Sequence, residues 1–309
     1  MDKFPLVIIG APTATGKSSL AINLALEFGG EIINADSLQV YRYLDIGTAK
    51  PTPEQRKLVH HHLLDVVAPD EEFNAAIYSE QARRIIADLA RMHRPVFVVG
   101  GTGLYIRALL RGIIETPQVD ENIRNHYRAL REAKGKEYLH NLLRQRDAAA
   151  AARLNPNDSV RVIRALEVLE QSGESITAIQ KRHSFHESPY LTCKIGLRVE
   201  RAELKRRIGL RTEKMMADGL LQEVKTILKK GYDVNLKPLQ SLGYKQAIEY
   251  GQGRYPLEEA IRLINRATWH YAKRQMTWFG ADTEIDWYHP DSVKEIHKKV
   301  REFLLNNPC

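Results

Sequence analysis

The stretch from Pro5 to Phe28 constrains the fold most strongly, because a strand pattern, a glycine turn and a helix pattern follow one another without a gap. "PLVIIG" has the length and the β-branched content of a buried strand. In "KSSLAINLALEF", Leu20, Leu24 and Phe28 recur at helical spacing, and the glycines at 29 and 30 mark its end. A strand that runs through a tight turn directly into a helix is typical of a parallel α/β sheet.

The rest of the first hundred residues repeats this alternation. "EIINAD" (31–36) predicts a second strand that ends on Asp36, and "RPVFVVGGTG" (94–103) predicts a third that runs into glycines. Between them, residues 69–93 carry Ile77, Ile85 and Leu89 at helical spacing, after acidic residues suited to a helix N-terminus. We therefore predict a parallel sheet with helices on both faces.

The pattern changes near residue 117. Residues 117–188 are charge-rich and helical in period, with "NPND" as a helix cap ahead of "SVRVIRALEVLEQSG". An apolar strand pattern returns in "YLTCKIGLRV", and a long basic and aromatic helix is expected in the tail. We predict an α/β core with a helical C-terminal part from 1–116 and 189–309, and a helical insertion domain from 117–188.

Composition narrows the class of protein. The formal net charge is +8, and residues 198–309 hold 21 Lys and Arg against 15 Asp and Glu. A polyanionic partner is one reading of this bias, and a basic surface that only aids solubility is the other. Two cysteines build neither a disulfide framework nor a paired-cysteine zinc site, and no stretch is long and apolar enough to span a membrane. We expect a cytoplasmic protein without a membrane partner.

The turn itself, "GAPTATGKS", fits the phosphate-binding pattern of a glycine, four residues and Gly-Lys-Ser, except that Ala11 stands at the first glycine position. Alanine suits that position only if its φ is negative. Backbone N–H groups and the helix dipole would surround an anion, with Lys17 at the terminal phosphate and Ser18 on Mg²⁺. Thr13 and Thr15 add hydroxyl donors. The predicted phosphate-binding residues are Ala11, Thr13, Ala14, Thr15, Gly16, Lys17 and Ser18.

Two further residues follow strands of the same sheet. In an open parallel sheet ligands bind beyond the carboxyl ends of strands, where Asp36, Thr102 and the loop converge. Each has a plainer interpretation, a cap for Asp36 and a turn residue for Thr102. The run His60-His61-His62 predicts a structural or loop role, because three adjacent side chains do not readily converge on one metal ion.

Several segments together carry a resemblance to a known family. "NADSLQVYRYLDIGTAKP" (34–51), "HHLLD" (61–65) and "VGGTGLYIRAL" (99–109) resemble signature segments of the tRNA dimethylallyltransferase, or isopentenyl-tRNA transferase, family. "VRVIRALEV" (160–168), "RTEKMMADGLLQEV" (211–224), "QSLGYKQ" (240–246) and "AKRQMTWF" (272–279) are also similar to family blocks, in order along nearly the whole chain.

The resemblance implies transfer of a dimethylallyl group from dimethylallyl diphosphate to N6 of the adenosine 3′ of a tRNA anticodon. Asp36 is then the general base, Thr102 lies beside the acceptor amine, and Arg211 joins the diphosphate site with Mg²⁺ as cofactor. The insertion would embrace the anticodon stem-loop, and we expect a monomer. The residues that the resemblance assigns to tRNA are Ser37, Leu38, Gln39, Arg124, Arg161, Arg164, Gly243, Tyr244, Lys245, Lys273 and Arg274.

Three other functions compete with this one. A kinase with the same loop needs a second Mg²⁺-supporting carboxylate at a strand end, and only Asp36 is offered. An adenylate isopentenyltransferase would use free AMP or ATP, which needs neither the insertion nor the basic C-terminal third. A binding module with a vestigial loop is disfavoured by the intact Lys17 and Ser18. The sequence leaves open which tRNAs are modified and in which order the substrates bind.

Overall fold

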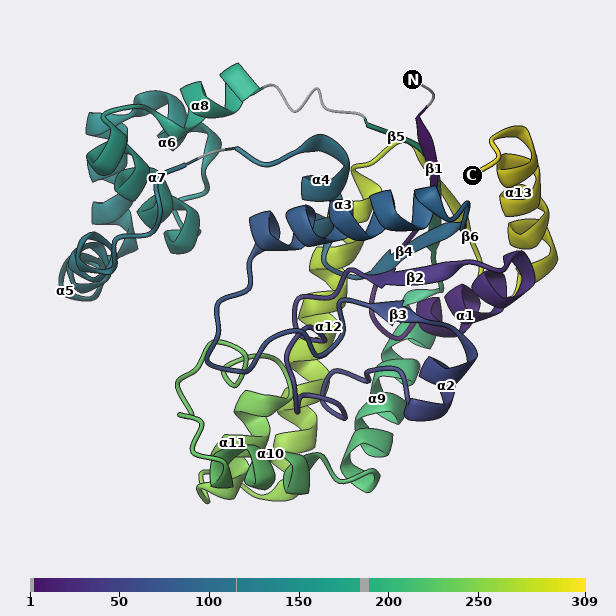
Figure 1. Ribbon diagram of the computed structural model, residues 1–309. Helices are drawn as coiled ribbons and strands as arrows, with labels where there is room; N and C mark the ends of the chain where they lie inside the picture. Colours follow the sequence, from purple (N-terminus) through teal and green to yellow (C-terminus); the bar gives the residue numbers. More distant parts are fainter. Residues whose placement is uncertain (1–2, 115, 184–188) are drawn as a thin grey trace. The chain divides into compact units, whose positions relative to one another are not determined.

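The computed structural model describes residues 3–114, 116–183 and 189–309 (Figure 1). The chain divides into two compact units, Met1–Leu110 with Ser188–Cys309, and Arg111–Glu187. The sequence patterns place the insertion at 117–188, and the end of that range, 184–188, lies outside the described residues.

The first unit contains a parallel sheet of the order β3-β2-β4-β1-β5-β6 (Figure 1). The predicted α/β fold is thus confirmed. Strands β3 and β6 were not predicted from the sequence, because neither has an apolar β-branched run. The strands are β1 (Phe4–Gly10), β2 (Glu31–Asn34), β3 (His61–His62), β4 (Val96–Gly100), β5 (Tyr190–Leu197) and β6 (Ile285–Tyr288).

Helices connect and cover these strands. In the first unit they are α1 (Lys17–Phe28), α2 (Pro53–Leu58), α3 (Ala75–Arg91), α4 (Gly103–Arg111), α9 (Arg201–Ala217), α10 (Leu220–Lys229), α11 (Tyr244–Gly251), α12 (Leu257–Gly280) and α13 (Val293–Asn306). In the second unit they are α5 (Glu121–Arg146), α6 (Ala148–Arg153), α7 (Ser159–Ser172) and α8 (Ile176–His183), and no strand lies among that unit's described residues.

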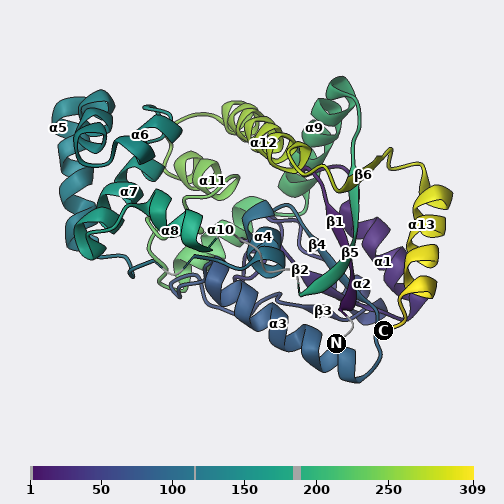
Figure 2. The same cartoon turned by 90° about the horizontal axis from the view of Figure 1, so that it is seen from above.

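The sheet is buried on both faces. On one face, Val7 and Ile9 of β1 pack with Leu24 of α1 and with Ile296 and Val300 of α13. Figures 1 and 2 show α3 and α4 on the other face. Each fully buried aliphatic side chain contributes about 1.5–3 kcal/mol relative to an exposed one. This double burial explains why β1 and β4 are continuous apolar runs.

Helix α3 starts later than its acidic residues suggest. Its N-cap is Asn74, whose side chain accepts hydrogen bonds from the backbone N–H groups of Ala76 and Ile77. The acidic residues at 70–72 precede the cap, so the expected role at the helix N-terminus is wrong. A single asparagine oxygen that satisfies two free N–H groups determines the start instead.

The second unit has its own apolar core. Tyr127, Leu139 and Leu143 of α5 pack against residues of α7 that include Val162 and Leu166. Asp158 caps α7 and accepts from the N–H of Arg161, as "NPND" predicts. A separate core is what a domain of this size needs in order to fold as a unit.

Candidate active site

The phosphate loop joins β1 directly to α1, as the sequence predicts. Gly16, the N-cap of α1, has φ 94°, and Ala14 has φ 63°. Ala11 is fully buried and is not among the residues with positive φ, which confirms the condition for an alanine there. Left-handed residues between right-handed ones turn successive N–H groups toward one concave surface, which suits an anion.

Two loop side chains share one backbone acceptor. The hydroxyl of Thr15 donates to the carbonyl oxygen of Pro12 at 2.8 Å, and Nζ of Lys17 donates to the same oxygen at 2.9 Å. Thr15 is 1% exposed, so its hydroxyl closes the loop. The expectation that this hydroxyl donates to a phosphate is therefore wrong, because its single proton is already used inside the loop.

Helix α12 holds the loop in place through Gln275, which the sequence did not single out. Its Oε1 accepts from the N–H of Thr13 at 2.8 Å, and its Nε2 donates to the carbonyl oxygen of Gly101 at 2.9 Å. Gln275 lies on the buried face of α12 with Ala272 and Phe279. A glutamine among apolar residues at helical spacing was the available signal, since a buried amide must find partners.

Two cations face each other beside the loop. Loss of hydration lowers the pKa of Lys17 from 10.5 to about 8; Arg211 lowers it further and the Asp36 carboxylate opposes the shift. Burial also lowers the pKa of Arg211, whose Nη2 donates to the carbonyl oxygen of Thr48 at 3.2 Å. In the part of the chain described, neither cation forms a salt bridge. Two desolvated cations without a paired carboxylate form a site for an anion.

Asp36 follows β2 and is held by its own turn. Its Oδ1 accepts from the N–H groups of Leu38 at 2.9 Å and Gln39 at 3.4 Å, while Oδ2 has no hydrogen-bond partner among the described residues. Asp36 therefore caps its own turn through Oδ1 and keeps Oδ2 open. Oδ2 remains able to accept a proton.

Thr102 supports the segment that carries Asp36. Its Oγ1 accepts from the N–H of Ser37 at 3.0 Å, and its own N–H donates to the carbonyl oxygen of Ala35 at 3.1 Å. Its Oγ1 also donates to Ser37 Oγ at 3.3 Å, and burial and the charge of Asp36 raise the pKa of the nearby Tyr271. Tyr271 was not predicted from the sequence.

Two cavities meet at these residues. The first, of about 60 Å³, is lined by residues that include Lys17, Ser18 and Gly101. The second, of about 270 Å³, is lined by Ser37, Leu38, Gly243 and Arg274, among others. The residues that border both cavities are Thr13, Asp36, Thr48, Arg211 and Tyr271. We call the first the cationic cavity, after Lys17 and Arg211, and the second the larger cavity. Asp36 borders both.

The side chain of Tyr244, one of the residues that the resemblance assigns to tRNA, is fully buried. Its hydroxyl donates to Glu223 Oε1 at 2.6 Å, and the two carboxylate oxygens of Glu223 accept three N–H groups from residues 45–47. Its ring lies so close to Gly47 that a Cβ there would come within 2.5 Å of it. Tyr244 therefore fixes the segment that leads to Thr48 at the cavity wall.

In the second unit, two of the predicted tRNA residues share one buried carboxylate as their partner. The carboxylate of Glu167 is 0% exposed and accepts from Arg124 at 2.6 Å and from Arg164 at 3.1 Å. Arg161 is 67% exposed and pairs with Asp158 at 2.9 Å. The sequence did not predict that Arg124 and Arg164 neutralise a buried carboxylate.

The predicted basic tRNA residues of the first unit are on its surface. Lys245, Lys273 and Arg274 are exposed, and the Arg274 guanidinium lies 5.7 Å from the centre of the Tyr271 ring. Gln39 donates from Nε2 to the carbonyl oxygen of Thr48 at 3.1 Å. None of the helices in the described ranges 3–114, 116–183 and 189–309 is both long and apolar enough to cross a membrane.

Comparison with known families gives the decisive observation. The model of the IPP transferase family matches residues 39–282, which is most of the chain. The chain belongs to this family. The resemblance found in the sequence segments is therefore confirmed.

Individual relatives in the family match over almost their full length. The tRNA dimethylallyltransferase 2 of Syntrophus aciditrophicus is 50% identical over 304 residues, with 98% of each chain covered. The tRNA dimethylallyltransferase of Geobacter metallireducens is 49% identical over 303 residues, again with 98% of each covered.

Solved structures match as well. The full-length tRNA isopentenylpyrophosphate transferase of Bacillus halodurans has a TM-score of 0.73 and 36% identity, and covers 99% of this chain and 98% of its own. A eukaryotic dimethylallyltransferase acting on tRNA has a TM-score of 0.82 and 25% identity, with 99% of this chain and 80% of that chain covered.

Proposed function

We propose that this chain is a tRNA dimethylallyltransferase. It transfers a dimethylallyl group from dimethylallyl diphosphate to N6 of the adenosine 3′ of the anticodon and releases diphosphate. The observation that supports this most is that Asp36 borders both the cationic cavity and the larger cavity next to it. One cavity suits a leaving diphosphate, and the other suits an acceptor base.

In the reaction, the N6 lone pair forms a bond to the allylic carbon, and the bond from that carbon to the diphosphate oxygen breaks. Negative charge builds on the leaving group, where Lys17, Arg211 and the N–H groups of the loop would stabilise it. Removing a single such donor typically costs about 10²–10³ in rate. The two cations have no carboxylate salt bridge in the described residues, so a diphosphate would supply the charge they lack.

Magnesium fits the oxygen donors of the site. Ser18 is exposed beside Lys17 and lines the cationic cavity, and a hydroxyl together with diphosphate oxygens is a ligand set that Mg²⁺ accepts. When bound, the ion would neutralise part of the diphosphate charge. Ser18 is therefore the protein ligand that we assign to it.

At the amine end, Asp36 would take the N6 proton on Oδ2. Its Oδ1 is fixed by Leu38 and Gln39, so the carboxylate is oriented before the substrate arrives. A general base contributes roughly 10²–10⁴ in rate. Thr102 accepts a hydrogen bond from Ser37, which follows Asp36, and Tyr271 lines both cavities together with Asp36. We assign Thr102 to positioning the 35–37 segment and the amine.

The target adenosine must leave the base stack of the anticodon loop in order to enter the larger cavity. Ser37, Leu38 and Gly243 line that cavity and would contact the base, with Gln39 beside them. The exposed cations Lys245, Lys273 and Arg274 would bind backbone phosphates, as would Arg161 in the helical unit, which we propose also contacts the anticodon stem-loop.

The test is a transfer assay with purified protein, Mg²⁺ and labelled dimethylallyl diphosphate, in which tRNA and AMP are offered side by side. We expect label in tRNA, at the adenosine 3′ of the anticodon, and none above background in AMP. A tRNA with guanosine at that position is the matched control. Equal transfer to AMP would favour an adenylate isopentenyltransferase, and no transfer to either acceptor would contradict the proposal.

A further inference from the structure

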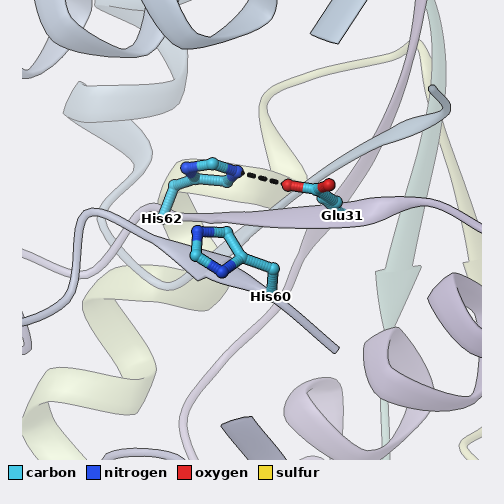
Figure 3. A group of neighbouring side chains, drawn as sticks. All are labelled: Glu31, His60 and His62. Carbon is cyan, nitrogen blue, oxygen red and sulfur yellow. Dashed lines mark hydrogen bonds and ion pairs between the residues drawn. The ribbon is translucent and has the colours of Figure 1, made fainter. Parts of the chain in front are cut away.

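Three side chains with metal-binding atoms gather at one edge of the sheet, away from the phosphate loop. One nitrogen each of His60 and His62 and one carboxylate oxygen of Glu31 lie within 4.8 Å of one another (Figure 3). Nε2 of His62 is 2.7 Å from Oε2 of Glu31, and the rings of His60 and His62 meet edge to face with centres 4.3 Å apart.

The backbone explains why these three converge and His61 does not. Strand residues alternate between faces, so His60 and His62 share one face while His61 points to the other. Ile32 pairs with His61 and Ile33 with His62 in parallel register, which puts Glu31 level with His60. His61 lines the cationic cavity with Ile32 instead. The reasoning that three adjacent histidines cannot converge holds, but Glu31 of the neighbouring strand takes the third place.

The donor set decides which ion would bind. Two imidazole nitrogens and one carboxylate oxygen form a common three-residue zinc set, with a fourth position left for water. Ligands about 2 Å from a tetrahedral zinc ion lie about 3.3 Å from one another. The His62–Glu31 pair is closer than this, at a hydrogen-bond distance of 2.7 Å, so it would open slightly and give up its shared proton, and the exposed His60 can rotate its ring to close the set. Mg²⁺ prefers oxygen ligands and should not compete.

The alternative is a simple hydrogen-bonded ion pair. Glu31 Oε1 lies 3.6 Å from Nη1 of Arg94, so this carboxylate already has one cationic neighbour besides His62. That pair accounts for Glu31 and His62, but it assigns no role to His60, which is exposed and meets the His62 ring edge to face. The position of His60 is therefore the observation that separates a metal site from an ion pair.

We propose that Glu31, His60 and His62 bind one Zn²⁺ ion, which fastens the short edge strand β3 to β2. The segment that follows β3 reaches the catalytic region, since Leu64 lines the cationic cavity and Asp65 pairs with Lys50 and Arg56 at 2.6 Å. Bound zinc would stabilise this segment because it binds only the folded state.

The experiment measures zinc binding to the tag-free, full-length chain by equilibrium dialysis, and the shift in melting temperature on addition of Zn²⁺. We expect one Zn²⁺ per chain, retained in excess Mg²⁺, and a raised melting temperature. His60→Asn and Glu31→Gln should weaken binding by more than about tenfold, since even the loss of a ligand's outer hydrogen-bond partner typically costs about 10- to 100-fold. Both should abolish the zinc-induced shift.

His61→Asn is the matched control, because it changes the same tripeptide on the other face of the strand. Each variant is compared with itself with and without zinc, so a general loss of stability does not affect the result. His60 is exposed, which keeps His60→Asn folded. Visible absorption of bound Co²⁺ provides a second readout, which should change in His60→Asn and not in His61→Asn. Absence of stoichiometric zinc in the wild type, or equal binding by His60→Asn, would overturn the proposal in favour of the ion pair.

Discussion

Arginines in the two units of this chain illustrate opposite uses of a buried charge. In the helical unit, Arg124 and Arg164 surround the carboxylate of Glu167, and each cation has an anionic partner within the fold. In the α/β unit, Arg211 lies beside Lys17, and within the described residues its hydrogen bond goes to a neutral carbonyl. The first arrangement is complete without a ligand, whereas the second keeps two cations beside the single carboxylate of Asp36 until an anion binds.

The difference shows how a structural charge can be told from a functional one. A buried carboxylate enclosed by two arginines is a structural charge, because removing one partner leaves an uncompensated buried charge and destabilises the fold. Burial and the charge of Arg211 lower the pKa of Lys17, so this pair of cations slightly destabilises the free protein, a cost that binding sites often carry.

The largest effect is expected at Asp36, whose negative charge acts on the pKa of both Lys17 and Arg211. Asp36→Asn should cut single-turnover transfer about 100-fold or more, because the proton of N6 loses its acceptor, while tRNA affinity changes little. Rapid-quench measurements at saturating tRNA test this. A variant with near-normal chemistry would remove Asp36 from the base role.

Next in size is Arg211→Gln, which should lower transfer about 100-fold and leave the melting temperature equal to or above that of the wild type. The matched control, Arg124→Gln, should have its main effect on stability, with a loss of about 1–3 kcal/mol in unfolding free energy, because Glu167 loses a buried partner. Thermal denaturation and single-turnover assays on both variants distinguish them. Similar behaviour of the two would erase the distinction between the sites.

A smaller effect should follow from the pKa of Lys17. Because this pKa is about 8 in the free protein, Lys17 is charged at pH 7 and mostly neutral at pH 9, so affinity for pyrophosphate should fall about tenfold over that range. Between pH 8 and 10.5, Lys17 is more often protonated in the unfolded chain than in the folded protein. The contribution of Lys17 to the free energy of unfolding therefore rises with pH over this range.

Calorimetric titration with pyrophosphate measures the change in affinity with pH. Pyrophosphate itself ionises in this range, so Lys17→Met is the control, because any pH dependence left in that variant comes from the ligand. The pH dependence of wild type minus variant should appear between pH 7 and 9. A difference that stays flat would show that Lys17 does not titrate in the site.

The smallest effect is expected for Tyr244→Phe, which should reduce the unfolding free energy by about 1 kcal/mol through loss of the hydrogen bond to Glu223. Affinity for tRNA should be unchanged, because the side chain is buried. Filter binding with tRNA and denaturant unfolding test both parts. A large fall in tRNA affinity at unchanged stability would restore Tyr244 to the interface.

Local patterns in the sequence predicted the parts of the site that depend on local geometry. The strand, turn and helix around Lys17 follow from hydrophobic period and glycine position, and the rule for strand ends brings Asp36 to the same edge. Strands β3 and β6 escaped prediction because neither has an apolar β-branched run, whereas β2, which is as short as β6, was predicted from its isoleucines. The left-handed φ at Ala14 was not expected either, since alanine rarely adopts it.

Long-range partners could not be derived from local pattern. Gln275 is 262 positions from Thr13 in the chain, and Tyr244 is buried only because Glu223 and Gly47 meet it in the fold. Arg211 was assigned through resemblance to the family, since an arginine on a helix surface carries no signal of its own. What the sequence lacked in each case was the identity of the packing neighbour.

The most direct test of the central claim is a crystal structure of this chain with Mg²⁺ and an analogue of dimethylallyl diphosphate whose bridging sulfur resists cleavage. The account predicts the diphosphate on the loop at 11–18 between Lys17 and Arg211, with the allylic carbon directed past Asp36 into the larger cavity. A diphosphate bound elsewhere, or an allyl group turned away from Asp36, would contradict it.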